Sequence, residues 1–183
     1  LIALAPTIII MMTSFTRIII VLHFTRSALN TQTAPPNQIL IGLALILTFF
    51  IMEPTITRIN EEAIQPFEEG TIDQDEDLEK GMAPLREFMY PQTQVKDVEL
   101  FMDIAGQEWD GTLEDIPNSV LVPSFMISEL RMAFWIGFMI YIPFIVIDMV
   151  VASTLMSMGM MMLPPTTISM PFKILLFVLA DGW

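Results

Sequence analysis

The sequence contains no cysteine and only one histidine, His23. The absence of cysteine excludes disulfide bonds, thiolate metal sites and thiol nucleophiles. A Ser-His-Asp triad would depend on His23, which lies in a polar segment and has no evident partner. The chain also lacks an H-E-x-x-H motif, a Walker loop and a G-x-G-x-x-G motif. We therefore expect no enzymatic activity, no bound cofactor and no metal site.

Basic residues are scarce as well: 8 Lys and Arg stand against 21 Asp and Glu, a formal net charge of −13. Such a balance argues against a nucleic-acid partner, because binding requires a positive face that neutralises phosphates. Most of the acidity is local, since 18 of the acids but only 4 of the bases lie between Glu53 and Asp115. A solvated acidic module therefore interrupts a chain that is otherwise close to neutral. Its acid run at residues 73–79 lacks the glycine-bearing loop of a calcium site.

Apolar residues, in contrast, make up 54% of the chain, and the mean hydropathy of +0.62 indicates membrane-related helices. Apolar helical segments are predicted at residues 1–22, 39–52, 120–147, 150–163 and 168–179, with a polar link over residues 23–38. The second segment has about 14 residues, fewer than the roughly 20 that span hydrocarbon comfortably. Extension through Glu53, Pro54 and Thr55 would supply the missing length.

Charged residues lie within or at the edges of these apolar segments: Arg17, Glu53, Glu129, Arg131, Asp148, Lys173 and Asp181. Charges at such depth are tolerated when they are paired or face protein or water. Glu129 and Lys173 carry opposite charges in separate segments, so they are candidates to pair, within the chain or between copies. The alternative is that each extends to an interface or forms local hydrogen bonds.

Within the acidic module the apolar spacing predicts two amphipathic helices. The two stripes consist of Leu78, Met82, Leu85 and Met89, and of Val95, Val98, Met102 and Ala105. Phe88 and Phe101 lie beside these stripes. They are interpreted as core residues or, alternatively, as anchors for contact with another subunit.

Five methionines fall within residues 156–162, around Gly159 and just before Pro164 and Pro165. Glycine permits a turn and proline cannot continue a helix, so the cluster should lie at a break between two apolar segments. One interpretation is that the methionines fill an irregular core. Three in a row cannot all face one core from a helix, however, and flexible thioethers also suit a surface that must deform.

The predicted fold class is all-α, with membrane-type helical hairpins and an inserted small acidic helical extracytoplasmic module. Residues 1–56 form an N-terminal apolar hairpin, residues 57–118 the acidic periplasmic module, and residues 119–183 a C-terminal apolar hairpin with the methionine-rich loop. The link at residues 25–38 carries Arg26 and no acid, which favours the cytoplasmic side for it. Because Leu1 already lies in an apolar run, we expect both ends to be truncated and a signal peptide upstream.

Seven ordered motifs are spread over nearly the whole chain: MMTSFTR (11–17), TQTAPPNQ (31–38), IGLAL (41–45), PLREFM (84–89), ISEL (127–130), GMMMLPP (159–165) and PFK (171–173). Together they resemble the FliP family, the export-gate subunits of the flagellar type III secretion system, with relatives in virulence injectisomes. The resemblance is weakest over residues 60–80 and 108–117. The sizeable acidic module favours the flagellar branch.

The resemblance implies a chain that assembles as five copies with FliQ-like and FliR-like subunits, and with an FlhB-like switch protein. The assembly would be a closed pore in the flagellar basal body, at the bacterial inner membrane and on its periplasmic side, and would conduct unfolded flagellar proteins. The family's methionine gasket matches Met160, Met161 and Met162, and its intersubunit ion pair matches Glu129 and Lys173. Two alternatives remain open: a single-chain secondary transporter or ion channel, and a membrane scaffold without a conduit.

Overall fold

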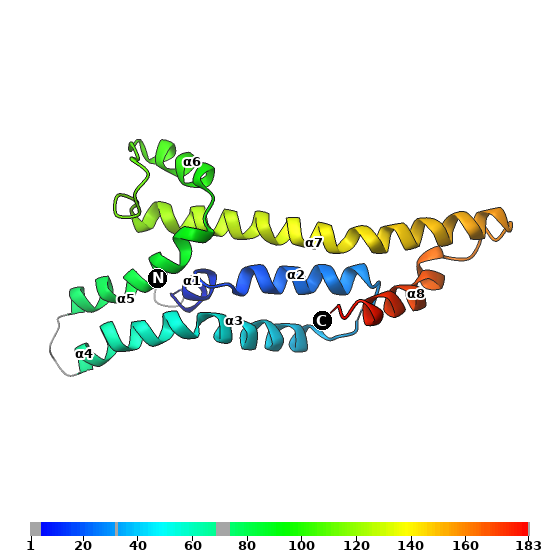
Figure 1. Cartoon of the computed structure of the whole chain (residues 1–183), viewed down its shortest axis with the longest axis horizontal. Helices are drawn as coiled ribbons and strands as arrows, with labels where there is room; N and C mark the ends of the chain where they lie inside the picture. Colours follow the sequence, from blue (N-terminus) through cyan, green and yellow to red (C-terminus); the bar gives the residue numbers. More distant parts are fainter. Residues whose placement is uncertain (1–4, 32, 69–73, 183) are drawn as a thin grey trace. The chain divides into compact units, whose positions relative to one another are not determined.

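The computed structural model describes residues 5–31, 33–68 and 74–182, and within these ranges it contains helices and no strand. The helices are α1 (Ala5–Met11), α2 (Phe15–Ala28), α3 (Asn37–Ile59), the π-helix η2 (Asn60–Ile64), α4 (Gln65–Glu68), α5 (Gln74–Met89), the 3-10 helix η3 (Tyr90–Gln92), α6 (Val95–Ala105), α7 (Asn118–Ser157) and α8 (Pro165–Leu179) (Figure 1). The prediction of an all-α fold is confirmed.

The chain divides into two compact units whose segments alternate along the sequence. Unit 1 comprises Leu1–Ile18 and Leu45–Met132, and unit 2 comprises Ile19–Ala44 and Ala133–Trp183. Helices α2, α3 and α7 each continue from one unit into the other. The division into segments 1–56, 57–118 and 119–183 stays a prediction.

The core of unit 1 joins α5, α6 and the first turns of α7. Its buried apolar residues are Met12, Met89, Val98, Met102, Ile116, Val120, Leu121 and Phe125. Helices α5 and α6 form where the two amphipathic stripes of the acidic module predicted helices. Met89, Val98 and Met102 of these stripes are buried, whereas Leu78 and Val95 at their N-terminal ends are exposed. The burial of the first three explains why a chain segment rich in acids folds against α7.

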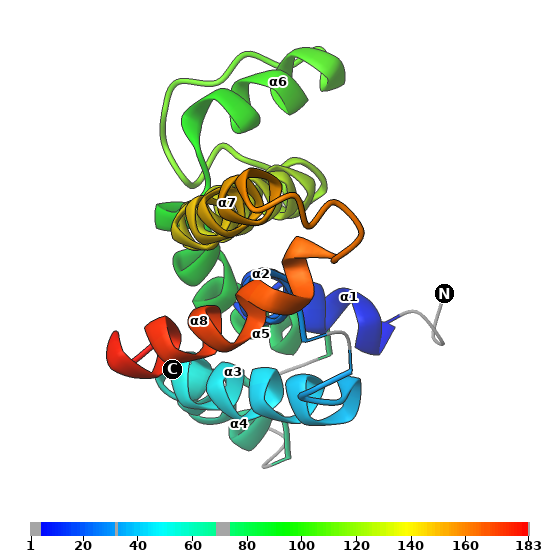
Figure 2. The same ribbon diagram turned by 90° about the vertical axis from the view of Figure 1, so that its right-hand side faces the viewer.

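Unit 2 contains the later part of α2, most of α7, and α8, which follows α7 after a reversal of the chain (Figures 1 and 2). Its buried apolar cluster consists of Ala28, Leu29, Phe144 and Phe177. Phe24 of α2 packs edge-on against Phe134 of α7, with ring centroids 5.5 Å apart. A Cβ atom at Gly137 would lie 2.6 Å from the Phe24 ring, so glycine permits this close approach of α2 to α7.

Two predicted segments, residues 120–147 and 150–163, are wrong as separate helices. The structure has a single helix of 40 residues, α7, that passes through Asp148 and ends at Ser157. The charge does not break the helix because α8 supplies partners for the Asp148 carboxylate. Residues 158–164 are a loop rather than the end of a helix.

The first predicted segment also differs, because residues 12–14 separate α1 from α2. The Thr13 hydroxyl bonds to the Ile10 carbonyl oxygen and accepts the Phe15 amide, in place of helical backbone hydrogen bonds. Helix α2 then runs to Ala28, through the first part of the predicted polar link. Its last turn is helical because Ala28 is buried in unit 2.

Helix α3 has 23 residues and includes Glu53 and Pro54. This is the extension that would give the predicted segment 39–52 enough length to span the hydrocarbon layer. Among the described residues, two helical stretches are long and apolar enough to cross a membrane, Asn37–Glu68 and Asn118–Ser157.

Candidate functional site

The methionine loop, residues 158–164, connects α7 to α8 within unit 2 (Figure 1). Gly159 has a φ of +76°, a backbone conformation that residues other than glycine rarely adopt. The Met160 amide donates to the Leu155 carbonyl oxygen and the Gly159 amide to that of Met156, each at 3.0 Å. This is the Schellman arrangement that ends helices at a left-handed glycine. The predicted turn at Gly159 is confirmed.

The prolines act at the other end of the loop. Pro164 is the extended residue before α8, and Pro165 is its first residue. A proline fits there because the first amide of a helix has no partner within the helix. Helix α7 has ended seven residues earlier, so the proline pair starts α8 and does not stop α7.

The three consecutive methionines lie on the surface of this chain. Met160, Met161 and Met162 are 44%, 82% and 98% exposed. The interpretation that they fill an irregular core of the chain is therefore wrong. An apolar loop that remains exposed after folding is available to line a surface shared with other molecules.

A buried ion pair joins α7 to α8 behind this loop. The Lys173 Nζ atom lies 2.6 Å from Asp148 Oδ2, and only 2% of the lysine side chain is exposed. The Ser169 hydroxyl donates to the other carboxylate oxygen, Oδ1. Ser169 and Lys173 are four residues apart on α8, so they lie on one face of the helix and hold both oxygens of a single carboxylate.

A second ion pair lies in unit 1 and joins α2 to α7. The Arg17 guanidinium donates through Nε to Glu129 Oε2 at 3.0 Å, and a second guanidinium nitrogen bonds to Oε1. Arg17 also donates to Gln92 Oε1 at 2.8 Å. The Glu129 side chain is fully buried, so this two-point contact is what makes its charge tolerable there.

The third ion pair connects the start of α6 to α7. Arg131 donates to Asp97 Oδ1 at 2.7 Å, and the Ser128 hydroxyl donates to Oδ2 at 2.7 Å. Ser128 also accepts the Gln94 amide at 2.9 Å. The buried Asp97 carboxylate thus has a partner for each oxygen.

The expectation that charges in the apolar segments are paired is met at Arg17, Glu129, Arg131, Asp148 and Lys173. The partners differ from the one proposed: Glu129 and Lys173 each bond to another residue of the same chain. Their pairing between copies stays a prediction.

Three residues of these ion pairs, Arg17, Asp97 and Asp148, were not predicted as site residues from the sequence. Arg17 and Asp148 were recognisable as charges in apolar segments, but nothing indicated their partners. Asp97 gave no signal, because it is one of many acids in a module that is mostly solvated.

Phe88 and Phe101 both pack against the core of unit 1 and remain partly exposed. The Phe88 ring meets Phe125 edge-on, with centroids 6.1 Å apart. Both residues therefore lie at the edge of the core, and their contact with another subunit stays a prediction. Among the described residues, no cluster of three or more His, Asp or Glu is placed to hold a metal ion.

Long apolar helices, buried interhelical ion pairs and an exposed methionine loop define a membrane-type all-α protein. The chain belongs to the FliP family, whose profile matches residues 1–183. It is 60% identical over 181 residues to the flagellar biosynthetic protein FliP of Bacillus subtilis (strain 168). The aligned region covers 99% of this chain and 82% of that protein.

Two further relatives carry the same name. The protein of Pectobacterium carotovorum subsp. carotovorum is 54% identical over 178 residues, or 97% of this chain and 69% of the relative. The protein of Aquifex aeolicus (strain VF5) is 50% identical over 183 residues, or 99% of this chain and 77% of the relative. The resemblance found in the sequence motifs is confirmed.

Proposed function

We propose that this chain is a component of the flagellar export apparatus and, within it, a subunit of a pore that conducts unfolded flagellar proteins across the inner membrane. Membership of the FliP family and the flagellar role named in its relatives support the coarser part. The single observation that carries the pore is the exposed methionine loop at the tip of the α7–α8 hairpin.

The exposed apolar surface supports assembly with other subunits. In the most apolar stretches of Asn37–Glu68 and Asn118–Ser157, only 28% and 11% of the residues are buried within the chain. Lipid or neighbouring protein must cover the remainder. The proposed partners are four further copies, FliQ-like and FliR-like subunits and an FlhB-like switch protein, with Phe88 and Phe101 as contacts between copies.

A gate for unfolded polypeptide must close against ions and still yield to side chains of many shapes. Methionine side chains have three rotatable bonds and a polarizable sulfur, so a ring of them can seal by apolar contact and repack around a moving chain. Met160, Met161 and Met162 would form that ring. The Schellman turn at Gly159 and the proline start of α8 would hold its two ends.

The test is to replace Met160, Met161 and Met162 with alanine in the full complex and to measure ion conductance across the membrane. We expect a severalfold rise in leak, because alanine cannot fill the same space. The matched control replaces Met139 and Met149, which are exposed on α7 away from the loop, and should leave conductance unchanged. Unaltered conductance in the loop variant would contradict the gasket.

A further inference from the structure

The α7–α8 hairpin is held together by a short series of contacts along one stripe of each helix. On α7 the stripe contains Phe144 and Asp148, and on α8 it contains Phe177, Lys173 and Ser169. The Phe144 and Phe177 rings pack with centroids 6.3 Å apart. One helical turn nearer to the methionine loop, Asp148 binds Lys173 and Ser169.

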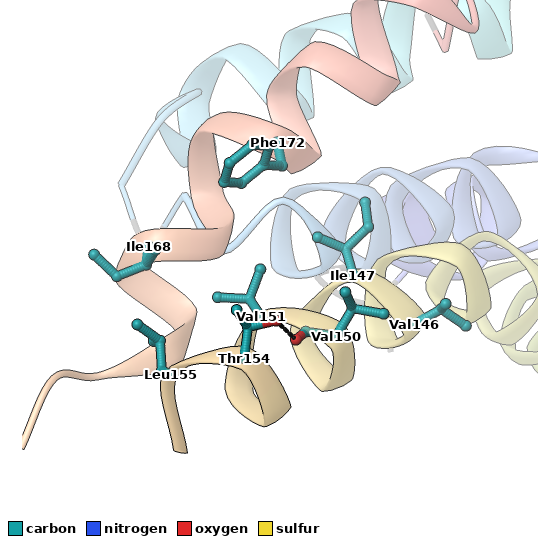
Figure 3. A pocket seen from close by; sticks show the side chains of 8 residues that line it. All are labelled: Val146, Ile147, Val150, Val151, Thr154, Leu155, Ile168 and Phe172. Atoms are coloured by element: carbon teal, nitrogen blue, oxygen red, sulfur yellow. Dashed lines mark hydrogen bonds between the residues drawn. The ribbon is translucent and has the colours of Figure 1, made fainter. Parts of the chain in front are cut away.

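Beside this ion pair, and from there toward the loop, the two helices leave a groove between them. An apolar groove of about 510 Å³ is lined by Val146, Ile147, Val150, Val151, Thr154 and Leu155 of α7 and by Ile168 and Phe172 of α8. Figure 3 shows the two α8 side chains on the opposite side of this groove from the α7 residues. Tight apolar packing therefore does not fix α8 against α7 in the part of the hairpin next to the loop.

We propose that Asp148 is the positioning residue of the methionine loop. By holding Ser169 and Lys173, its carboxylate sets the register of α8 along α7, and with it the place of Met160, Met161 and Met162. Apolar contacts such as Phe144 with Phe177 are not directional, and α8 could slide past α7 without losing much of them. A carboxylate that binds two donors one turn apart is satisfied in one register only, since a slip of one turn is about 5.4 Å.

If the ion pair of Asp148 and Lys173 only stabilised the fold, its removal would leave the position of the methionine loop unchanged. A buried ion pair can often be replaced by apolar residues of similar size without loss of stability, while its best-attested contribution is register. The double substitution Asp148→Leu/Lys173→Met removes the ion pair and leaves neither of the two charges buried alone. The variant chain should fold, and the position of its loop should change.

The experiment measures that position directly, and no cysteine among these 183 residues competes for the label. Spin labels at Met161→Cys and Met139→Cys report the distance from the loop to a fixed point on α7. Labelled copies are diluted with unlabelled ones in the purified complex, so that the distance within one chain is read by pulsed electron resonance. The unaltered sequence should give one narrow distribution.

In Asp148→Leu/Lys173→Met we expect the main distance to move by about one helical turn, or about 5 Å, or the distribution to double in width. Lys173→Arg keeps the pair and should keep the distance. Ser153→Ala is the matched control, because the Ser153 hydroxyl donates within α7, to the Met149 carbonyl oxygen. An unchanged distribution in the double variant overturns the proposal.

Should the double variant not fold, Asp148→Asn decides the question. It keeps an acceptor for Ser169 and loses the charge, so we expect broadening, and a native distribution there overturns the proposal. The inference rests on the proposed pore, yet the two can fail separately. A displaced loop with unchanged conductance in the methionine variants would retain the positioning role and reject the gasket.

Discussion

At the scale of single residues, Gly159 has a backbone conformation that few other residue types adopt. Its φ of +76° is left-handed, and no heavy atom beyond its chain neighbours lies within 4 Å of a Cβ placed there. A substitution would therefore be strained by the backbone alone and not by any collision. Gly42 is equally open but lies inside α3 with ordinary helical geometry.

The prediction at this scale compares Gly159→Ala with Gly42→Ala. The first should lower the free energy of unfolding by about 1–2 kcal/mol, the cost of a left-handed residue with a side chain. The second should raise it by about 0.5–1 kcal/mol, because alanine is the better helix former. Thermal unfolding in detergent measures both, and equal shifts in the two variants would contradict the turn.

The partners of the buried charges also belong to this scale. The sequence shows that Glu129 must be neutralised, because an unpaired carboxylate in an apolar segment is costly. It cannot show by what, since Arg17 lies 112 residues away and no local pattern connects the two. Ser169, which is four residues before Lys173, is an ordinary serine until α7 brings Asp148 to it.

At the scale of helices, spacing predicted α6 well and hydropathy misread α7. The predicted stripe spans the same residues as α6, Val95 to Ala105, because the spacing of apolar residues indicates an amphipathic helix, and its central residues Val98 and Met102 are buried. The break predicted near Asp148 is absent, because hydropathy registers a charge and not its partner. The residues that bind Asp148 come from α8, more than 20 residues later in the sequence, so a local hydropathy average does not include them.

Gly137 supports a second prediction at this scale, on the packing of α2 against α7 in unit 2. In Gly137→Ala the new methyl group would lie 2.6 Å from the Phe24 ring, so the ring or the helix must shift. We expect a loss of about 1–3 kcal/mol in unfolding free energy, as is usual for overpacking. The companion variant Phe24→Leu should relieve most of that loss. A Gly137→Ala chain as stable as the parent would show that the helices are not in close contact.

The connection between α6 and α7 yields a prediction on pH. The Thr112 amide donates to Asp110 Oδ1 at 2.8 Å and lowers the pKa of that exposed carboxyl, with a smaller contribution from the Thr112 hydroxyl. Because the folded pKa lies below the unfolded one, this contact stabilises the loop above the unfolded value of about 3.9 and is lost as the pH falls through the folded value.

Nuclear magnetic resonance of the Thr112 amide should therefore show no change from pH 7 to pH 5 and a shift only below about pH 4. Asp110→Asn should abolish the shift. A midpoint above the ordinary value for aspartate would contradict the hydrogen bond.

At the scale of the whole molecule, the question is whether Glu129 and Lys173 bind partners in the same chain or in a neighbouring copy. The structure satisfies Glu129 with Arg17 and Lys173 with Asp148, whereas the family resemblance pairs Glu129 with Lys173 of a neighbouring copy. Both arrangements can coexist only if Glu129 binds Arg17 and Lys173 at once, and Lys173 binds Asp148 and Glu129 at once. Double-mutant cycles on the assembled complex separate them, because contacting residues couple by about 0.5–3 kcal/mol and distant ones add.

Glu129→Ala should reduce the yield of assembled complex, and neutralising Lys173 as well should restore part of it if the pair forms between copies. The parallel cycle on Arg17 and Glu129 should couple in any case, since both lie in unit 1. Additivity between Glu129 and Lys173, alongside coupling between Arg17 and Glu129, would confine the charge to a single chain.

The length of α7 has a consequence for membrane topology. Its 40 residues correspond to about 60 Å of helix, roughly twice the thickness of the hydrocarbon layer. The sequence alone predicted two apolar segments here, residues 120–147 and 150–163, which would make two crossings if each spanned the membrane, whereas one continuous helix can cross at most once. One crossing too many in the count places every later segment of the chain on the wrong side of the membrane. Such a count would place the methionine loop on the opposite side of the membrane.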